Sequence, residues 1–347
     1  MHKYSLLILF IVLSLSFSSC IRNQAGKESV VFDCAESIIV DLGRYSPAFL
    51  DSQDGVGAFE HVCFMNNRVY IHSSQSLQSF DSETGKDPVS YSRRGRAANE
   101  YSSLWGFNVG NGSVFLHDLS GNKILKYFPE GSLEHIFNYS TETPRFQSFA
   151  ILMDGTVVGK RSFQGVPTQE ISVWSPEFNY EGDVHSDSKT KSGLMLSYPF
   201  SYSEDGDVLF VRYFRNEVYT VGKDSLTLRY RIDFGDRNLP VLGDDKDEYD
   251  ALDLFRESNG KASYISNFSE DRKYIAFQFL MSPEGVAYAV HKKGSDSSRV
   301  FRFSTDDEIV SINTYGGYCY VFTQNIKGDT MFYRLGLSDL MNYDNDR

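Results

Sequence analysis

Turn sequences recur along this 347-residue chain at intervals of about 45 residues, and each is followed by a short apolar segment. The clear turns are Asn66-Asn67, Gly110-Asn111-Gly112, Asp154-Gly155, Asp205-Gly206 and Gly316-Gly317. Asn and Gly tolerate the positive φ angles that tight hairpin turns require. With Asn67, Gly112, Gly155, Gly206 and Gly317 as markers, successive gaps are 45, 43, 51 and 111 residues.

The long last gap accommodates two units, and a weaker turn at residues 269–272 divides it. Six units with a period of 40–50 residues indicate a β-propeller. Within units, the hairpin is followed by a polar turn and a strand that ends in an aromatic residue, as at 77–81, 124–128 and 300–303. We therefore predict an all-β fold, a six-bladed β-propeller of four-stranded antiparallel blades. Packing between blades also explains the 27 Phe and 22 Tyr.

One segment, residues 241–262, interrupts the strand pattern with many acidic residues around apolar positions 251, 252, 254 and 255. This spacing predicts a short helical insertion near 247–257, between the fourth and fifth blades. A calcium site is the alternative, but the EF-hand glycine and the distal bidentate Glu are absent from the segment. A solvated acidic face is the preferred interpretation.

The N-terminus has the plan of an export signal, with a basic start, an apolar run from Leu6 to Phe17, and two serines before Cys20. The small residues followed by cysteine resemble a bacterial lipobox, in which the signal is cleaved before a cysteine that is then acylated. We interpret residues 1–19 as a lipoprotein signal peptide, 20–29 as a tether, 30–341 as the propeller and 342–347 as a polar tail. A plain secreted protein and an uncleaved anchor are the alternatives.

Besides Cys20, the chain has Cys34, Cys63 and Cys319, without zinc-type spacing. A Cys34–Cys319 disulfide is conceivable, because a ring would bring the chain ends together and export permits disulfides. Buried free thiols in strands are the preferred alternative.

The net charge of −12 argues against a nucleic-acid partner, which would require a basic face. Nucleophile-elbow, zincin, Walker and dinucleotide motifs are absent from the sequence, so it identifies no catalytic residue and no cofactor.

Two histidines, His72 and His117, each lie five residues after a turn marker, so we expect them at equivalent positions of adjacent blades. If these positions converge on the channel, they could form a metal or anion site. Lys160 occupies the same position in the third unit, which argues against a metal. The alternative is that these residues only end hairpin strands, and we predict no metal.

A dense basic patch, Arg93, Arg94 and Arg96 with Glu100 nearby, is the other candidate site, because guanidinium groups suit anionic ligands. The alternative is a solvated or internally paired loop.

Three features resemble the six-bladed, TolB-like β-propeller lipoproteins of Gram-negative envelopes, which are relatives of the NHL-type propellers. They are the lipobox at Cys20, the loop at residues 94–101, and the segment 230–235 followed by Leu239-Pro240. In the loop, Ala97-Ala98-Asn99 stands where the family has Gly-Pro-Gly. The resemblance implies a propeller and an envelope location, with no settled activity.

The expected function is therefore that of a binding or scaffold module for a small molecule or protein, lipid-anchored in the cell envelope. The outer membrane is the expected membrane, with the propeller in the periplasm or at the surface. Two alternatives stay open: a propeller lyase or hydrolase acting on envelope or extracellular glycans or peptides, and an accessory or sensor subunit of an outer-membrane uptake complex.

The anchor is tested by Cys20→Ser, which removes the acylated sulfur. We expect the unaltered chain to partition into membranes and the Cys20→Ser chain to lose this partitioning, as measured by detergent phase separation and immunoblotting. A soluble unaltered chain that is processed at another site would contradict the lipoprotein interpretation.

Overall fold

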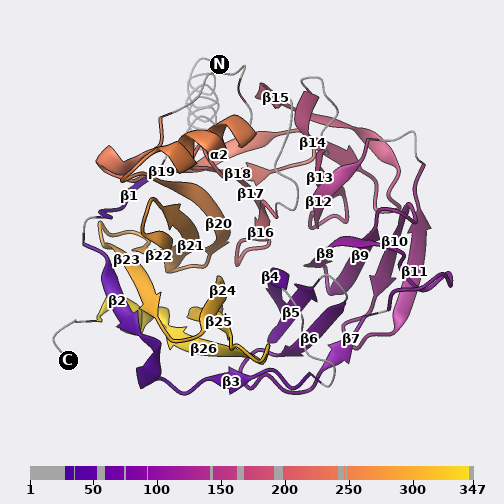
Figure 1. Ribbon diagram of the computed structural model, residues 1–347. Coiled ribbons are helices and arrows are strands. Elements are labelled where there is room, and N and C mark those ends of the chain that lie inside the picture. The colour runs from indigo at the N-terminus through magenta and orange to yellow at the C-terminus, as the bar shows by residue number, and fades with distance from the viewer. Residues whose placement is uncertain are drawn as a thin grey trace, which may run out of the picture.

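Six sheets, each with a core of antiparallel strands, surround a central axis and form a closed ring (Figure 1). The computed structural model describes residues 28–34, 36–52, 59–73, 76–91, 93–140, 144–161, 168–190, 198–240, 246 and 248–343. Each sheet is a blade in which consecutive strands run from the axis to the rim. The predicted fold class, a six-bladed β-propeller of four-stranded blades, is confirmed.

The first three blades are each built from one continuous stretch of chain. Blade 1 contains β4 (Phe59–Met65), β5 (Arg68–Ser73), β6 (Leu77–Asp81) and β7 (Val89–Ser90). Blade 2 contains β8 (Leu104–Gly110), β9 (Ser113–Asp118), β10 (Lys123–Tyr127) and β11 (Leu133–Asn138). Blade 3 contains β12 (Phe146–Ile151), β13 (Val157–Arg161), β14 (Thr168–Trp174) and β15 (Tyr180–Thr190).

The last three blades each add a strand from the N-terminal segment at the rim. Blade 4 contains β16 (Phe200–Tyr202), β17 (Val208–Arg212), β18 (Glu217–Val221), β19 (Leu226–Asp233) and β1 (Glu28–Val31). Blade 5 contains β20 (Ala262–Glu270), β21 (Tyr274–Met281), β22 (Gly285–Lys292), β23 (Ser298–Ser304) and β2 (Ile38–Asp41). Blade 6 contains β24 (Glu308–Tyr315), β25 (Tyr318–Gln324), β26 (Thr330–Gly336) and β3 (Ala48–Phe49).

The predicted marker turns join the first and second strands of the blades. Asn66 and Asn67 have φ angles of 51° and 58°, and Gly316 and Gly317 have 58° and 81°, so both residues of each pair lie in the left-handed region. In a four-stranded meander the first and third turns lie at the same end. These turns therefore share one face of the ring, which we call the turn face.

The ring is closed by antiparallel pairing of β3 with β26, with Phe49 opposite Met331 and Ala48 opposite Phe332. Strands β1 and β2 pair in parallel with β19 and β23, so the N-terminal segment follows the rim of three blades (Figure 1).

The cysteine bridge that the sequence left open is absent: Cys34, Cys63 and Cys319 are free in the described chain. Cys34 lies after β1 beside blades 4 and 5, whereas Cys319 lies in β25, in a different hydrophobic cluster. The ring is closed by β3, which follows Cys34, so closure does not bring Cys34 to Cys319. Free buried thiols are therefore confirmed for both residues, although Cys34 lies outside the strands.

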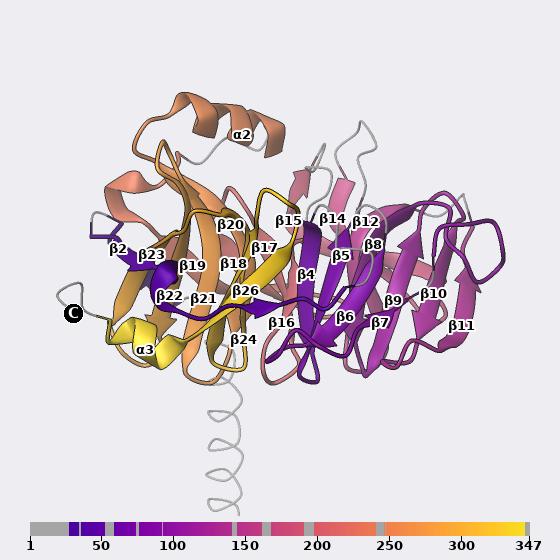
Figure 2. The same cartoon turned by 60° about the horizontal axis from the view of Figure 1, so that its bottom comes forward.

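Helix α2 (Glu248–Glu257) follows β19 and precedes β20, which confirms the predicted helical insertion. It packs Ala251 and Phe255 onto the core of blades 4 and 5, on the face opposite the turn face, which we call the helix face (Figure 2). The other helices are α3 (Leu337–Met341) and the 3-10 turns η2 (Leu42–Arg44) and η3 (Gly235–Arg237). Across the described ranges, none of the helices has the length and apolar character needed to cross a bilayer.

Large side chains fill the spaces between neighbouring blades. Between blades 2 and 3, the rings of Phe115 and Phe149 form an edge contact with centroids 6.4 Å apart. Between blades 4 and 5, the ring centroids of Tyr230 and Phe268 lie 6.1 Å apart. The predicted role of the aromatic residues in blade packing is thus observed.

Ring closure also involves Gly85, in the turn that follows β6. A Cβ atom at Gly85 would lie 2.4 Å from the Phe49 carbonyl oxygen, and φ is +71°. Gly294 has the same φ but open space around it. We expect Gly294→Ala to cost about 1 kcal/mol of unfolding free energy from backbone strain. Gly85→Ala should cost about 1–3 kcal/mol more, because it displaces β3.

Chemical denaturation of both variants measures this difference directly. Equal losses for the two substitutions would show that the Gly85–Phe49 contact does not stabilise the closed ring.

Candidate functional site

The inner strands of all six blades surround a cavity of about 1080 Å³ on the ring axis. Its wall extends to the turn face, where Asn111, Gly206 and Gly316 lie at the rim. We call this cavity the funnel. Its volume lies just above the usual range for small-molecule pockets, about 300–1,000 Å³.

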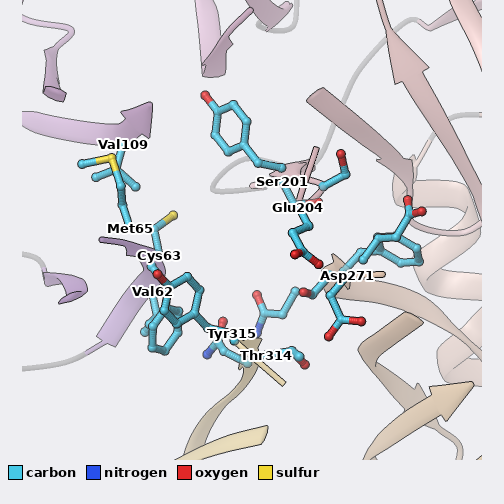
Figure 3. A pocket seen from close by; sticks show the side chains of 18 of the residues that line it. Val62, Cys63, Met65, Val109, Ser201, Glu204, Asp271, Thr314 and Tyr315 are labelled. Carbon is cyan, nitrogen blue, oxygen red and sulfur yellow. The ribbon is translucent and has the colours of Figure 1, made fainter. Parts of the chain in front are cut away.

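The wall of the funnel is chemically divided (Figure 3). Blades 1 and 2 contribute apolar and sulfur-containing side chains, including Val62, Met65 and Val109. Across the cavity, blades 4 and 5 contribute Glu204 and Asp271 together with Arg272 and Lys273. Glu204 is paired with Arg272, whose Nε lies 3.2 Å from its carboxylate. A ligand in the funnel therefore meets an apolar surface on one side and a charged surface, with carboxylates and two cationic side chains, on the other.

The turns of the turn face are acidic, both those around the funnel mouth, which join first and second strands, and those nearer the rim, which join third and fourth strands. The turns between first and second strands and between third and fourth strands contain eleven acidic and five basic residues. The acidic residues are Glu83, Asp87, Glu130, Asp154, Glu177, Glu204, Asp205, Asp207, Asp224, Asp271 and Asp296, and the basic residues are Lys86, Lys223, Arg272, Lys273 and Lys293. We call these turns the acidic collar, and its field favours cationic partners.

Glu270, at the end of β20, is 3% exposed and belongs to an ionic network between blades 4 and 5. Its carboxylate accepts hydrogen bonds from Arg229 (2.9 Å), Lys293 (2.7 Å) and the Tyr230 hydroxyl (2.8 Å). Burial raises the pKa of Glu270, but these donors outweigh burial and hold the pKa below its usual value. Glu270 is thus a fixed anion that joins two blades.

Tyr198, which precedes β16 of blade 4, reaches across the axis to the opposite blade 1. Its ring stacks on His61 with centroids 3.9 Å apart and planes inclined by 3°. Its hydroxyl lies 3.3 Å from Nδ1 of His72. Because Tyr198 and His61 both line the funnel, this contact lies within the cavity and braces the ring across its diameter.

Tyr202, in β16, provides a second brace nearer the turn face. Its hydroxyl donates to Oδ1 of Asn108 in β8 (2.8 Å) and accepts from the Ile151 backbone N–H in β12 (2.9 Å). A Cβ at Gly110 would lie 2.7 Å from that hydroxyl, so glycine leaves room for it. One side chain therefore ties blade 4 to blades 2 and 3.

The two predicted histidines lie at the ends of the second strands of adjacent blades, as expected, but each faces the next blade. His72 packs on Phe107 of β8. His117 packs on Phe146 of β12 and bonds the Tyr139 hydroxyl at 2.8 Å. Burial lowers the pKa of His72 to about 4 and of His117 to about 3, so both are neutral at physiological pH.

Neither histidine belongs to a metal-binding group, since the described residues include no cluster of three or more His, Cys, Asp or Glu with suitable geometry. Lys160, at the same position of blade 3, binds both carboxylate oxygens of Glu248 in α2 at 2.9 Å. At this position of the second strand, His72 and His117 thus pack against the next blade, and Lys160 anchors α2.

The arginine loop lies between β7 and β8, on the helix face and away from the funnel. The Glu100 carboxylate accepts Nε–H of Arg93 (2.7 Å) and the Ala97 backbone N–H (2.9 Å), so it organises the loop itself. The backbone N–H of Ala97 and the Arg93 side chain lower the pKa of Glu100. Arg94 and Arg96 are exposed. The remaining predicted site residue, Cys20, lies outside the described residues.

The sequence interpretation did not single out His61, Cys63, Tyr198, Tyr202 or Glu204 as site residues. A usable signal was present, because each marker turn follows the inner strand of its blade. Residues shortly before a marker therefore line the axis, as His61 and Cys63 do before Asn67.

Fold and cavity together define a six-bladed β-propeller with a divided, acid-rimmed axial funnel. A model of the family described as "Domain of unknown function (DUF4934)" matches residues 56–346, and the chain belongs to this family.

Two crystal structures from Bacteroides share the fold. One is a candidate exported protein of Bacteroides fragilis, at 16% identity and a TM-score of 0.66, with 92% of this chain and 96% of that chain covered. The other is a member of the DUF4221 family from Bacteroides vulgatus, at 10% identity and a TM-score of 0.57, with 82% and 94% covered. Among curated proteins, none matches the sequence.

The ionic network predicts a specific pH dependence. Because the folded pKa of Glu270 lies below the unfolded value, its carboxylate stabilises the fold above the unfolded pKa, near 4.3, and the contribution is lost as pH falls through the folded pKa. We expect Glu270→Gln to cost about 3 kcal/mol at pH 7, because Arg229 and Lys293 lose their anion.

Denaturant titrations at pH 7 and at pH 3 test this expectation, with the exposed collar variant Asp224→Asn as control. The difference between Glu270→Gln and the unaltered chain should shrink in acid, while Asp224→Asn should stay within about 0.5 kcal/mol throughout. A pH-independent loss would point to packing rather than charge.

Proposed function

We propose that this protein is an exported, lipid-anchored propeller that binds its ligand in the axial funnel. The apolar wall of blades 1 and 2 beneath turns of net negative charge carries this proposal, because the two together favour a cationic group joined to an apolar group. The occupant that fits this chemistry is a basic and apolar segment of a protein in the same envelope. The export-type N-terminus, the resemblance to TolB-like lipoproteins and the similarity to a candidate exported protein support the location.

The direction of β1 bears on how the anchored ring is oriented. β1 is parallel to β19, which runs from the turn face toward the helix face, so the N-terminal end of β1 is directed toward the turn face. Seven residues, 21–27, separate the anchor cysteine from β1, and the eight steps from Cys20 to Glu28 span at most about 29 Å. The funnel mouth would then face the membrane.

If the acidic collar faces a membrane, its negative charge distinguishes between lipid and protein ligands. Anionic lipid headgroups would be repelled, whereas a basic protein segment at the membrane surface would be attracted. We therefore favour a membrane-associated protein over the bilayer itself. A protein that binds a membrane-associated partner in this way would act as an accessory or sensor subunit of an envelope complex.

Two exposed apolar residues on opposite faces provide a matched test. Met153 is 74% exposed at the funnel mouth, and Ile326 is fully exposed in the turn after β25, on the helix face. A photo-crosslinking amino acid at either position would be activated by light in intact cells that produce the tethered protein. We expect adducts at position 153 in clear excess over position 326, and a reduced yield when Asp271→Asn is added.

Adducts of equal yield at both positions, or in excess at 326, would contradict binding through the funnel. If neither position formed adducts although the protein is membrane-associated, the binding function itself would be wrong.

A further inference from the structure

We propose that the funnel holds a binding site for a soft monovalent metal ion, Cu(I), formed by His61, Cys63 and Met65. This inference goes beyond the proposed function and does not depend on the membrane anchor or on the ligand. An imidazole, a thiol and a thioether come from three alternating positions of one inner strand, β4. Thiolate and thioether sulfur select Cu(I), and imidazole is compatible with it.

The three side chains share one side of β4, as alternate residues of a strand do. Cys63 and Met65 pack against the same hydrophobic cluster between blades 1 and 2, and the His61 ring lies 5.4 Å from that of Phe107 in β8. All three residues line the funnel and are partly exposed. In Figure 3 the Cys63 sulfur points into the cavity, on the same wall as Met65 and Val109. A metal ion can therefore reach the site from the funnel mouth.

Two of the donor atoms already face each other, because Sγ of Cys63 lies 3.0 Å from Nε2 of His61. The imidazole is held by its stack on Tyr198, which limits ring rotation and preorganises the nitrogen. Binding would break the thiol S–H bond, release the proton to solvent and form a sulfur–copper bond. The S–H···N contact would be replaced by nitrogen and sulfur ligation of one ion, with the Met65 thioether as a third donor.

The charge balance of this wall favours a monovalent ion. A thiolate with Cu(I), an imidazole and a thioether is neutral, so the complex tolerates the apolar surroundings of Phe107 and Val109. Zn²⁺ with the same donors would leave one net positive charge beside that wall. The carboxylates that hard cations require lie across the funnel, on blades 4 and 5.

The other two described cysteines provide internal controls. Cys34 is buried between the rim strands, and burial raises the pKa of its thiol to about 11. Cys319 is fully buried in β25, against the hydroxyl of Tyr288. Neither lines the funnel.

The test uses the full chain, purified in detergent and kept anaerobic, with Cu(I) as the probe and bicinchoninate as the competing ligand. We expect one Cu(I) per chain at this site, bound more tightly as pH rises because a proton is released. Met65→Leu, which keeps the side-chain volume, should weaken binding about tenfold, and Cys63→Ser should weaken it by more. Cys34→Ala should bind as the unaltered chain does.

Alkylation provides a second measurement that does not rely on a substituted chain. Bound Cu(I) should protect Cys63 from N-ethylmaleimide, as read by peptide mass mapping, and leave the modification of Cys34 and Cys319 unchanged. Retention of full affinity in Cys63→Ser, or unchanged Cys63 alkylation with Cu(I) present, would overturn the proposal. The cell-based crosslinking at Met153 has no bearing on this result, so failure of one proposal is distinguishable from failure of the other.

Discussion

The pairing of β3 with β26 is the contact on which the rest of the molecule depends. It joins Ala48 and Phe49 to Phe332 and Met331, close to opposite ends of the chain. Without it, blade 6 would lack its fourth strand and blades 1 and 6 would lose this connection at the rim. A contact of such long sequence separation has a large loop-closure entropy cost, which packing around the whole ring must offset. The parallel additions of β1 and β2 extend that attachment over two more blades.

Closure also explains why polar contacts reach across the axis. Six inner strands fixed in a ring cannot move apart, so a side chain from one blade can reach its opposite partner without flexible backbone. Tyr198 uses this geometry to stack on His61, and Tyr202 uses it to bond Asn108 and Ile151. The funnel is therefore a braced cavity, and side chains on its wall are held at fixed separations. That rigidity is what binding by preorganised groups requires.

Local signals in the sequence predicted the blades well, because each blade depends on a short turn whose residues are chemically distinctive. Asn66-Asn67 and Gly316-Gly317 adopt the positive φ angles that their residue types indicate, and α2 forms where the apolar spacing changes. Strands β1 and β2 carry no such signal, since they are four residues long and join their blades in parallel without a turn. The position of Cys34 could not be inferred for the same reason.

The candidate site was predictable only in part. His72 and His117 were correctly placed at equivalent strand ends, but their direction depends on the register of the second strand, which turns both rings into the next blade. The Tyr198–His61 stack joins residues 137 positions apart, and nothing local to either residue indicates it. Residues on the axis are instead found by asking which positions precede each marker turn.

Corresponding positions in the six blades face the same funnel, but they carry different side chains. The inner strand of blade 1 presents sulfur and apolar groups, whereas the turns after the inner strands of blades 4 and 5 present charged groups, among them Glu204 and Asp271. The wall of β4 can thus hold a metal in neutral form, while the collar around Glu204 and Asp271 attracts a cation. Because a Cu(I)–thiolate unit adds no net charge, occupation of one wall leaves the field at the other unchanged. Two binding events of different chemistry are therefore compatible within a single rigid cavity.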